Sequence, residues 1–319
     1  MGGRLGTGHL TVAYIAMLFA GVVTAAEPER GFADPVLGRW DLTVQGADGA
    51  YPSWLEVRLR TENQLMAEFV GRFGSVRHAS AVSFADGELQ VRIPVQYERE
   101  GDELVFSGRL ADDRLSGTVD NGVGTSLAWT AARAPLLSHT EVAHWGEPVE
   151  LIGDDLSGWQ PRFDQHDGCW RVNDGVLSAT PPCVDIVSEM SFDDFRVQLQ
   201  FRYPPGSNSG VYLRGRYEVQ IQDDRDKAID PLRIGGLYGF IAPVANAAGK
   251  PDEWQTMDIT LIGRRLTVVL NGNEVISARE IPGITGGALD SDEGSAGPLM
   301  LQGDHGPIEF RSIVVTPGN

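Results

Sequence analysis

Hydrophobic and polar residues alternate in short runs along most of the chain, and almost no stretch repeats with the period of an α-helix. Side chains on a β-strand point to opposite faces in turn, so this alternation predicts strands with one buried face. The 39 glycines and 18 prolines fall largely between the runs, where they favour turns. The pattern predicts an all-β protein.

The first region of strands covers residues 34–134. It contains roughly eight alternating runs in about a hundred residues, joined by tight turns such as Ala85-Asp86-Gly87. A meander of this kind can close on itself, so we expect a small barrel-like domain. Residues 135–146 show no clear period and predict a linker.

The second region covers residues 147–317 and alternates again. Residues 195–203 predict a long strand, and Asn271-Gly272 predicts a tight turn between two further strands. Many strands without helices predict a sandwich of two sheets. We therefore expect two independent β domains joined by the linker.

The most informative alternation runs from Asn208 to Asp223. One parity is apolar and would face a core: Val211, Leu213, Tyr217, Val219 and Ile221. The other parity is polar: Tyr212, Arg214, Arg216, Glu218, Gln220 and Gln222. Guanidinium groups, amides and a carboxylate orient polyhydroxylated ligands through hydrogen bonds, so this face is a candidate binding surface. An ordinary amphipathic hairpin with a solvated polar face is the alternative interpretation.

A single strand over these residues would be roughly 40 Å long, which exceeds the usual length of a strand. We therefore expect a hairpin whose loop is residues 214–216. A three-residue loop pairs Leu213 with Tyr217 and Val211 with Val219, so that each face stays consistent.

The formal net charge is −18. Such an acidic chain is repelled by nucleic acids and by anionic membrane surfaces, so we expect neither as a partner beyond any export signal. The charge is compatible with a neutral small-molecule ligand.

Residues 1–26 have the features of a signal peptide. Arg4 gives a positive start, residues 10–23 form an apolar run, and Ala25-Ala26 lie at a cleavage site of small residues. We expect export to the periplasm or the extracellular space, with an uncleaved anchor as the alternative.

The chain has two cysteines, Cys169 and Cys183, which flank a predicted hairpin with Asn173-Asp174-Gly175 at its turn. Export permits a disulfide between them, and two free buried thiols are the alternative. No spacing typical of a structural zinc site occurs.

Several segments of the second region resemble one family in order and spacing. They are Leu151–Trp159, Asn208–Asp223, Gly239–Pro243, Glu253-Trp254, Leu270–Gly272 and Leu301–Ser312. Together they resemble the 3-keto-disaccharide hydrolase domain over about residues 146–317. Family members often have Phe-Asn-Gly where this chain has Ile152-Gly153-Asp154. The resemblance implies a concanavalin-like jelly-roll sandwich that acts on glycosides whose sugar carries a 3-keto group.

The polar residues fit such a reaction. A conventional glycosidase needs two carboxylates, and the polar face of the central stretch offers only Glu218. A ketone at C3 acidifies the hydrogen on C2, so one base can remove it, and the group at C1 then leaves. Water adds to the resulting enone to complete a net hydrolysis.

With the resemblance in hand, we assign Glu218 and His305 to proton transfer, and Arg214 with Gln220 to the carbonyl or its enolate. Asp304 orients His305 if the segment is a loop. The remaining substrate-binding candidates are polar residues of the same motifs: Asn208, Tyr212, Asp223 and Gln302. The structural alternatives are that Glu218 and Arg214 pair with each other and that His305 is a turn residue.

Two further interpretations stay open at this point. Glu218, Asp223 and His305 could hold a divalent cation, although no spacing requires one and the cofactor is therefore unknown. A non-catalytic, lectin-like protein could use the same fold and the same amides, because fold does not fix function.

Overall fold

The computed structural model describes residues 1–3, 34–62, 64–96, 103–120, 124–163 and 169–318. The described residues from Asp34 onward belong to one compact unit. The expected signal peptide lies almost entirely outside the described residues and stays a prediction. In the described part of the chain, no helix combines the length and the apolar character needed to cross a membrane.

The N-terminal region forms an antiparallel sheet, preceded by the short 3-10 helix η1 (Asp34–Val36). Within the described residues the sheet has nine strands in the order β4-β3-β2-β1-β9-β8-β7-β6-β5. They are β1 (Gly38–Gly46), β2 (Gly49–Thr61), β3 (Gln64–Val70), β4 (Arg77–His78), β5 (Ala81–Ala85), β6 (Glu88–Pro94), β7 (Glu103–Ala111), β8 (Arg114–Asp120) and β9 (Ser126–Arg133).

This sheet curls so that its two ends meet. The backbone N–H of Ala79 donates to the carbonyl of Ala67 in β3, and that of Ser80 donates to the carbonyl of Arg92 in β6, at 2.9 and 2.8 Å. The apolar parity of the strands fills the interior, with Trp40, Phe106 and Trp129 among the buried residues. The barrel-like meander expected from the alternation is confirmed.

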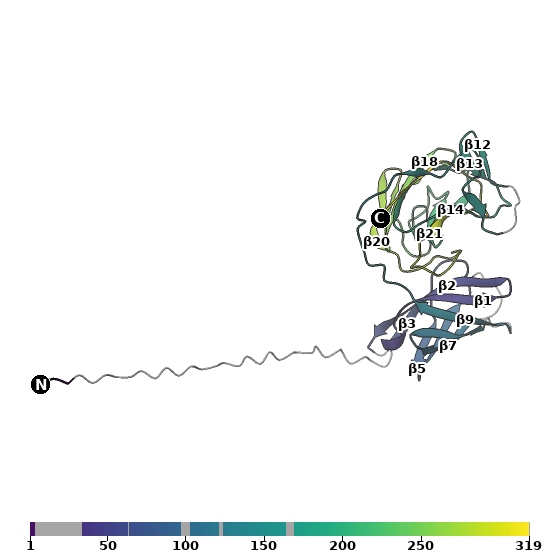
Figure 1. Cartoon of the computed structure of the whole chain (residues 1–319). Helices are drawn as coiled ribbons and strands as arrows, with labels where there is room; N and C mark the ends of the chain where they lie inside the picture. The colour runs from purple at the N-terminus through teal and green to yellow at the C-terminus, as the bar shows by residue number, and fades with distance from the viewer. Residues whose placement is uncertain (4–33, 63, 97–102, 121–123, 164–168, 319) are drawn as a thin grey trace. The chain divides into compact units, whose positions relative to one another are not determined.

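The C-terminal region is a sandwich of two sheets (Figure 1). The larger sheet has the order β12-β13-β22-β15-β18-β19-β20, and β10 also pairs with β22. Its strands are β10 (Val149–Glu150), β12 (Arg171–Asn173), β13 (Val176–Ala179), β15 (Phe195–Arg202), β18 (Gln255–Ile262), β19 (Arg265–Leu270), β20 (Asn273–Glu280) and β22 (Ile308–Pro317). The smaller sheet, in the order β11-β14-β21-β16-β17, contains β11 (Trp159–Pro161), β14 (Ile186–Phe192), β21 (Gly297–Leu301), β16 (Asn208–Leu213) and β17 (Tyr217–Gln222).

The core of the sandwich lies between these two sheets. One parity of β15 contributes Phe195, Val197, Leu199 and Phe201, all of them buried. Trp54 of β2 and Val70 of β3 also belong to this core, so the N-terminal sheet packs against the sandwich. Whether the two regions fold independently stays a prediction.

The disulfide is confirmed. Cys169 and Cys183 are bonded, with their Cα atoms 5.5 Å apart, and they flank the hairpin of β12 and β13 as expected. Two free thiols are therefore excluded. The indole N–H of Trp170 donates to the carbonyl of Val184 at 2.7 Å, which ties the chain on both sides of the bond together.

Candidate active site

The site is built on the hairpin of β16 and β17. The strands pair as predicted, with Leu213 opposite Tyr217 and Val211 opposite Val219. Tyr212 and Glu218 are therefore direct partners on the polar face, and each is only 3% exposed. The polar face is buried, so the alternative of a merely solvated face is excluded.

A pocket of about 270 Å³ opens over the end of this polar face. Most of the residues proposed from the sequence line it: Asn208, Tyr212, Glu218, Gln220, Gln302, Asp304 and His305. The hairpin supplies the first four, and the loop after β21 supplies the others. The structure thus brings together two motifs that lie more than eighty residues apart in the chain.

Glu218 is the most perturbed acid of the pocket. Burial raises its pKa to about 8, and the nearby charges of Asp185 and Asp304 act in the same direction. The hydroxyl of Tyr212, which donates to Oε2 at 2.9 Å, and the charge of His305 act in the opposite direction. A buried carboxyl with such a pKa exchanges a proton near neutral pH, as a general acid or base must.

His305 and Asp304 lie in the loop between β21 and β22, where neighbouring side chains can meet. Nδ1 of His305 is hydrogen-bonded to Oδ1 of Asp304, which leaves Nε2 as the other nitrogen able to exchange a proton. This hydrogen bond raises the pKa of His305, although burial opposes it. For Asp304, burial raises the pKa, but the hydrogen bond and the charge of His305 outweigh it and hold the pKa below its usual value.

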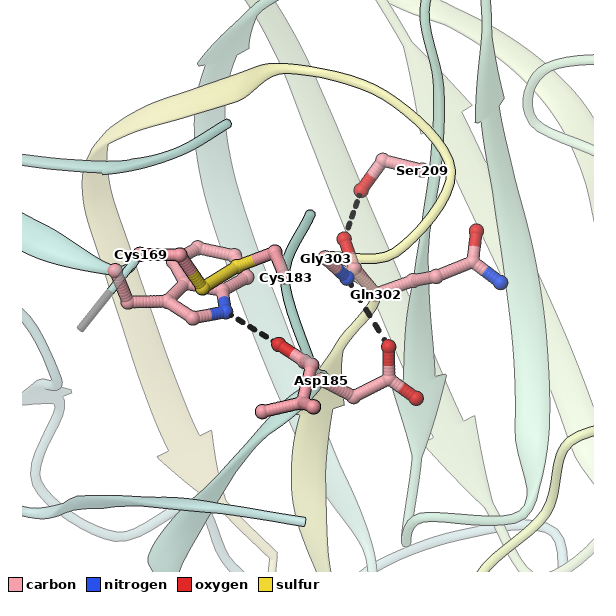
Figure 2. Close-up of a disulfide and its surroundings, with 8 residues drawn as sticks. Cys169, Cys183, Asp185, Ser209, Gln302 and Gly303 are labelled. Atoms are coloured by element: carbon pink, nitrogen blue, oxygen red, sulfur yellow. Dashed lines mark hydrogen bonds between the residues drawn. A yellow bond between two sulfur atoms is a disulfide. The ribbon is translucent and has the colours of Figure 1, made fainter. Parts of the chain in front are cut away.

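Arg162 and Asp185 are the two charged pocket residues that the sequence analysis missed. Nη1 of Arg162 pairs with Oδ2 of Asp185 at 2.9 Å. The backbone N–H of Gly303 donates to Oδ1 of Asp185 at 3.1 Å (Figure 2). Burial raises the pKa of Asp185, while Gly303 and Arg162 lower it. Asp185 stands alone in the apolar run Val184–Val187, and a single carboxylate in such a run was the signal that could have pointed to it.

Asp185 also connects the pocket to the disulfide. Cys183 precedes it by two residues, and Asp185 in turn holds Gly303, which precedes Asp304 and His305 (Figure 2). The disulfide therefore fixes the segment that positions the imidazole loop.

The structure places Arg214 and Asp223 away from the pocket. Arg214 lies in the turn of the hairpin with φ of 51°, is fully buried, and pairs with Asp193 and Asp194 at 2.9 and 3.2 Å. It therefore does not pair with Glu218, and its assignment to the enolate does not fit this position. Asp223 accepts a hydrogen bond from the backbone of Gly206 at 2.9 Å and stabilises a loop.

Buried amides complete the pocket. Oε1 of Gln220 and Oδ1 of Asn208 have no hydrogen-bond partner among the described residues. Both residues line the pocket, so a ligand hydroxyl can satisfy these acceptors. This is the kind of contact that the sequence predicted for the polar face.

The glycine-rich segment after β17 borders the pocket. The N–H of Gly235 donates to the carbonyl of Gln220 at 2.9 Å, and the N–H of Tyr238 donates to the carbonyl of Glu218 at 2.9 Å. The segment therefore pairs with the free edge of β17, and Tyr238 lines the pocket. It extends the smaller sheet at this edge.

A metal site is not apparent in the described ranges. No group of three or more His, Cys, Asp or Glu side chains in these ranges is arranged to hold a metal ion. Asp223 lies outside the pocket, so the ligand set Glu218, Asp223 and His305 does not converge.

Comparison with protein families assigns the C-terminal region. The model of the 3-keto-alpha-glucoside-1,2-lyase-like domain matches residues 147–316, more than half of the chain. The chain belongs to this family. The match confirms the resemblance carried by the sequence motifs, and it makes this a carbohydrate-active protein that acts on glycosides. The N-terminal sheet lies outside the matched residues.

Several solved structures are similar to part of the chain. A candidate glycosyl hydrolase from Parabacteroides distasonis ATCC 8503 is 27% identical, over 56% of this chain and 91% of its own, with a TM-score of 0.47. A second from the same organism is 25% identical, over 54% of this chain and 100% of its own, with a TM-score of 0.43. The carbohydrate binding module CBM66 from Bacillus subtilis is 15% identical, over 50% of this chain and 92% of its own, with a TM-score of 0.28. No curated protein matches the chain.

Proposed function

We propose that the chain cleaves glycosides whose sugar carries a keto group at C3. The observation that carries this proposal is the buried carboxyl of Glu218, whose pKa is raised to about 8, beside the His305–Asp304 pair. A ketone at C3 makes the C2 proton weakly acidic, and a base with a pKa near the working pH suits its removal. The reaction then needs one base, one acid and hydrogen-bond donors, all of which line the pocket.

The elimination begins at Glu218. Its carboxylate takes the proton from C2, the electron pair forms a C1–C2 double bond, and the bond from C1 to the leaving oxygen breaks. The imidazolium of His305 gives its proton to that oxygen. The raised pKa of His305 favours the protonated ring that this step requires.

Rehydration completes the cycle. Neutral His305 takes a proton from water, the hydroxide adds to C1 of the enone, and protonated Glu218 returns its proton to C2. The net reaction consumes one water and releases the 3-keto sugar and the free leaving group. Both side chains end in their starting protonation states.

Negative charge that develops on the C3 oxygen needs a partner in the pocket. Arg162 lines the pocket and takes the place that the sequence analysis gave to Arg214. Because Arg162 is mostly buried, its charge acts through a medium of low polarity, where it stabilises an enolate more strongly than it would in water. The family description supports the scheme, because a 1,2-lyase breaks the bond at C1 while removing a proton at C2.

A second candidate function is conventional glycoside hydrolysis by two carboxyl groups. Asp185 favours it, because this buried acid with a raised pKa lines the same pocket as Glu218. However, both oxygens of Asp185 already accept hydrogen bonds, from Arg162 and from Gly303. Such a carboxylate is better suited to hold the loop than to attack a sugar.

We also propose that the protein acts in the periplasm or outside the cell. The apolar run of residues 10–23 and the disulfide support this location, because disulfides persist in oxidising compartments.

The decisive experiment compares oxidised and unoxidised sugars. Purified protein is incubated with 3-keto-trehalose, with 3-keto glucosides and with the parent compounds, and free sugar is measured together with deuterium uptake at C2 in heavy water. Cleavage of keto substrates alone, with deuterium in the product, supports the proposal. Cleavage of the parent compounds without deuterium uptake supports the two-carboxyl mechanism. Binding of both classes without turnover of either supports a lectin-like protein.

A further inference from the structure

A loop of the N-terminal sheet forms part of the pocket wall. After β3 the chain runs through residues 71–76 to β4, and Phe73 and Gly74 from this loop line the pocket together with Glu218 and His305. Phe73 is a large apolar residue that is 55% exposed. An exposed aromatic ring at the edge of a polar pocket is a stacking surface for a ligand.

The loop is held against the sandwich by close backbone contacts. The N–H of Gly287 donates to the carbonyl of Arg72 at 2.9 Å. A Cβ atom on Gly286 would lie 2.3 Å from the carbonyl oxygen of Gly74, and one on Gly239 would lie 2.8 Å from Cβ of Ser75. Only residues without a side chain allow this approach, so the loop position is defined by the fit between the two regions.

Neighbouring residues of the N-terminal sheet support the same contact. The rings of Trp54 and Phe240 meet edge to face with centroids 5.4 Å apart. Gly283 lies so close to the indole of Trp54 that a Cβ atom there would be 2.1 Å from Nε1. The guanidinium of Arg72 lies over the ring of Phe73 at 5.2 Å and restricts its orientation.

The same glycine segment contacts the proton-transfer group. The hydroxyl of Tyr212 lies 3.0 Å from the carbonyl oxygen of Gly286 and 2.9 Å from Oε2 of Glu218. Arg72 and Gly74 are therefore joined to the reacting carboxyl through Gly286, Gly287 and one tyrosine. A ligand whose sugar is placed for proton removal by Glu218 lies beside this loop.

We propose that Phe73 and the backbone of Gly74 form a subsite for the group attached to C1 of the sugar, either a second sugar ring or an aromatic leaving group. The inference rests on the proposed function. It assigns the N-terminal sheet, which lies outside the family match, a direct part in substrate selection. A ring face that stacks on Phe73 favours bulky, flat leaving groups over small ones.

The test uses the full-length protein and the variant Phe73→Ala, with Phe73→Trp as the conservative replacement. Kinetics are measured for 3-keto glucosides that carry a methyl group, a second glucose or an aryl group at C1. We expect Phe73→Ala to raise KM roughly threefold to tenfold for the two bulky substrates, as loss of one stacking contact implies. The methyl glucoside should respond little, and Phe73→Trp should restore binding.

Phe163→Ala is the matched control. Phe163 is 54% exposed and carries the guanidinium of Arg162 over its ring at 5.3 Å, but it does not line the pocket. Any effect of Phe163→Ala on KM should be the same for the methyl, glucosyl and aryl substrates. Equal effects of Phe73→Ala on all three substrates, or no effect on any, would overturn the subsite.

The subsite and the proposed function can fail separately. If wild-type protein turns over no 3-keto glycoside, the function fails, and calorimetric binding of a disaccharide to wild type and Phe73→Ala still tests the subsite. Weaker binding by the variant then supports it, and equal binding rejects it. If wild type is active and Phe73→Ala is indistinguishable from it, the subsite alone is wrong.

Discussion

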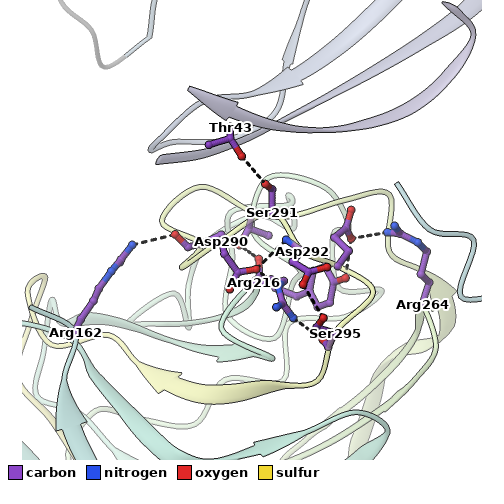
Figure 3. Close-up of polar contacts among 12 residues, drawn as sticks. Thr43, Arg162, Arg216, Arg264, Asp290, Ser291, Asp292 and Ser295 are labelled. Carbon is purple, nitrogen blue, oxygen red and sulfur yellow. Dashed lines mark hydrogen bonds and ion pairs between the residues drawn. The ribbon is translucent and has the colours of Figure 1, made fainter. Parts of the chain in front are cut away.

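The N-terminal sheet and the C-terminal sandwich are both built from alternating strands, yet they place charged side chains differently. In the N-terminal sheet, pairs such as Arg109 with Glu88 lie at the surface, with half or more of each side chain exposed. In the sandwich, Arg264 and Glu293 pair at 2.6 Å and are 2% and 0% exposed (Figure 3). Surface pairs contribute little to stability, whereas burial of charge is costly. The two regions therefore differ in how far they remove paired charges from water.

One acid of the N-terminal sheet departs from this rule. Asp41 in β1 is buried, and its pKa is raised to about 9, first by burial and then by the charge and hydrogen bond of Glu293. Glu293 also accepts hydrogen bonds from Tyr217 at 2.6 Å and from Arg264. In the same area Thr43 and Ser291 lie within hydrogen-bond distance at 3.3 Å (Figure 3). The N-terminal sheet therefore buries an acid where it meets the sandwich.

The largest expected effect comes from removing the buried carboxylate of the pocket. Glu218→Gln preserves shape and hydrogen bonding but deletes the base, so turnover of a 3-keto glycoside should fall by about a hundredfold or more. Exchange of the C2 proton with heavy water should be lost as well. The pH profile of wild-type kcat/KM should be bell-shaped, because Glu218, with a pKa of about 8, must be ionised to accept the proton, and His305, whose pKa is raised, must be protonated to donate one.

Binding of the substrate to Glu218→Gln should change little. Asp304→Asn serves as a comparison, because it weakens the orientation of His305 without removing the base. If Glu218→Gln retains wild-type turnover and proton exchange, Glu218 is structural and His305 becomes the base.

A smaller effect is expected for Asp41→Asn. The folded-state pKa of Asp41 is raised, so folding takes up a proton between about pH 4 and pH 9, and stability falls as the pH rises through this window. Asparagine resembles the protonated acid and removes this dependence. The variant should exceed wild type in free energy of unfolding at pH 8 by about 1 kcal/mol or more, measured by urea denaturation.

The difference between Asp41→Asn and wild type should shrink as the pH falls to 4 and below, where the wild-type acid becomes protonated in the unfolded state as well as in the folded state. If the difference in unfolding free energy did not change with pH, Asp41 would be ionised in the folded protein, and Glu293 would not raise its pKa.

The smallest effect is expected at the surface of the N-terminal sheet. Arg109→Gln breaks the exposed pair with Glu88, and the free energy of unfolding should change by no more than about 0.5 kcal/mol. Thermal denaturation at low and high salt checks this. If Arg109→Gln lost as much unfolding free energy as the loss of a buried ion pair would cost, the two regions would not differ in how their charged pairs contribute to stability.

Much of the fold could be predicted from alternation and turn chemistry. The pairing of Leu213 with Tyr217 followed from parity, because a three-residue loop is needed to keep both faces consistent. Arg214 was misplaced by the same reasoning. The alternation of apolar and polar residues continues through the turn in the sequence. At φ of 51°, however, the backbone of Arg214 is no longer extended, and its side chain does not point to either face of the strand.

The rest of the site depends on contacts that no local pattern encodes. Arg162 follows the three-residue strand β11 and Asp185 precedes β14, so both lie outside the strands whose alternation could have indicated them. Phe73 and Gly74 come from a different sheet and reach the pocket through packing of the two regions. His305 was found because its motif is specific, and its pairing with Asp304 held because the segment is a loop.

The hydroxyl of Tyr212 has only one hydrogen, yet two acceptors compete for it, Glu218 and the carbonyl of Gly286. When Glu218 is ionised, the carboxylate is the stronger acceptor, and the carbonyl loses its partner. When Glu218 is protonated, it can donate to the phenol oxygen, and the phenol hydrogen turns to Gly286. We expect the amide resonance of Gly287 to shift with pH around 8 in wild type and to stay fixed in Glu218→Gln. The hydrogen bonding of Gly286 and Gly287, which contact the loop that carries Phe73, would then change once in every turnover, when Glu218 takes up the substrate's proton.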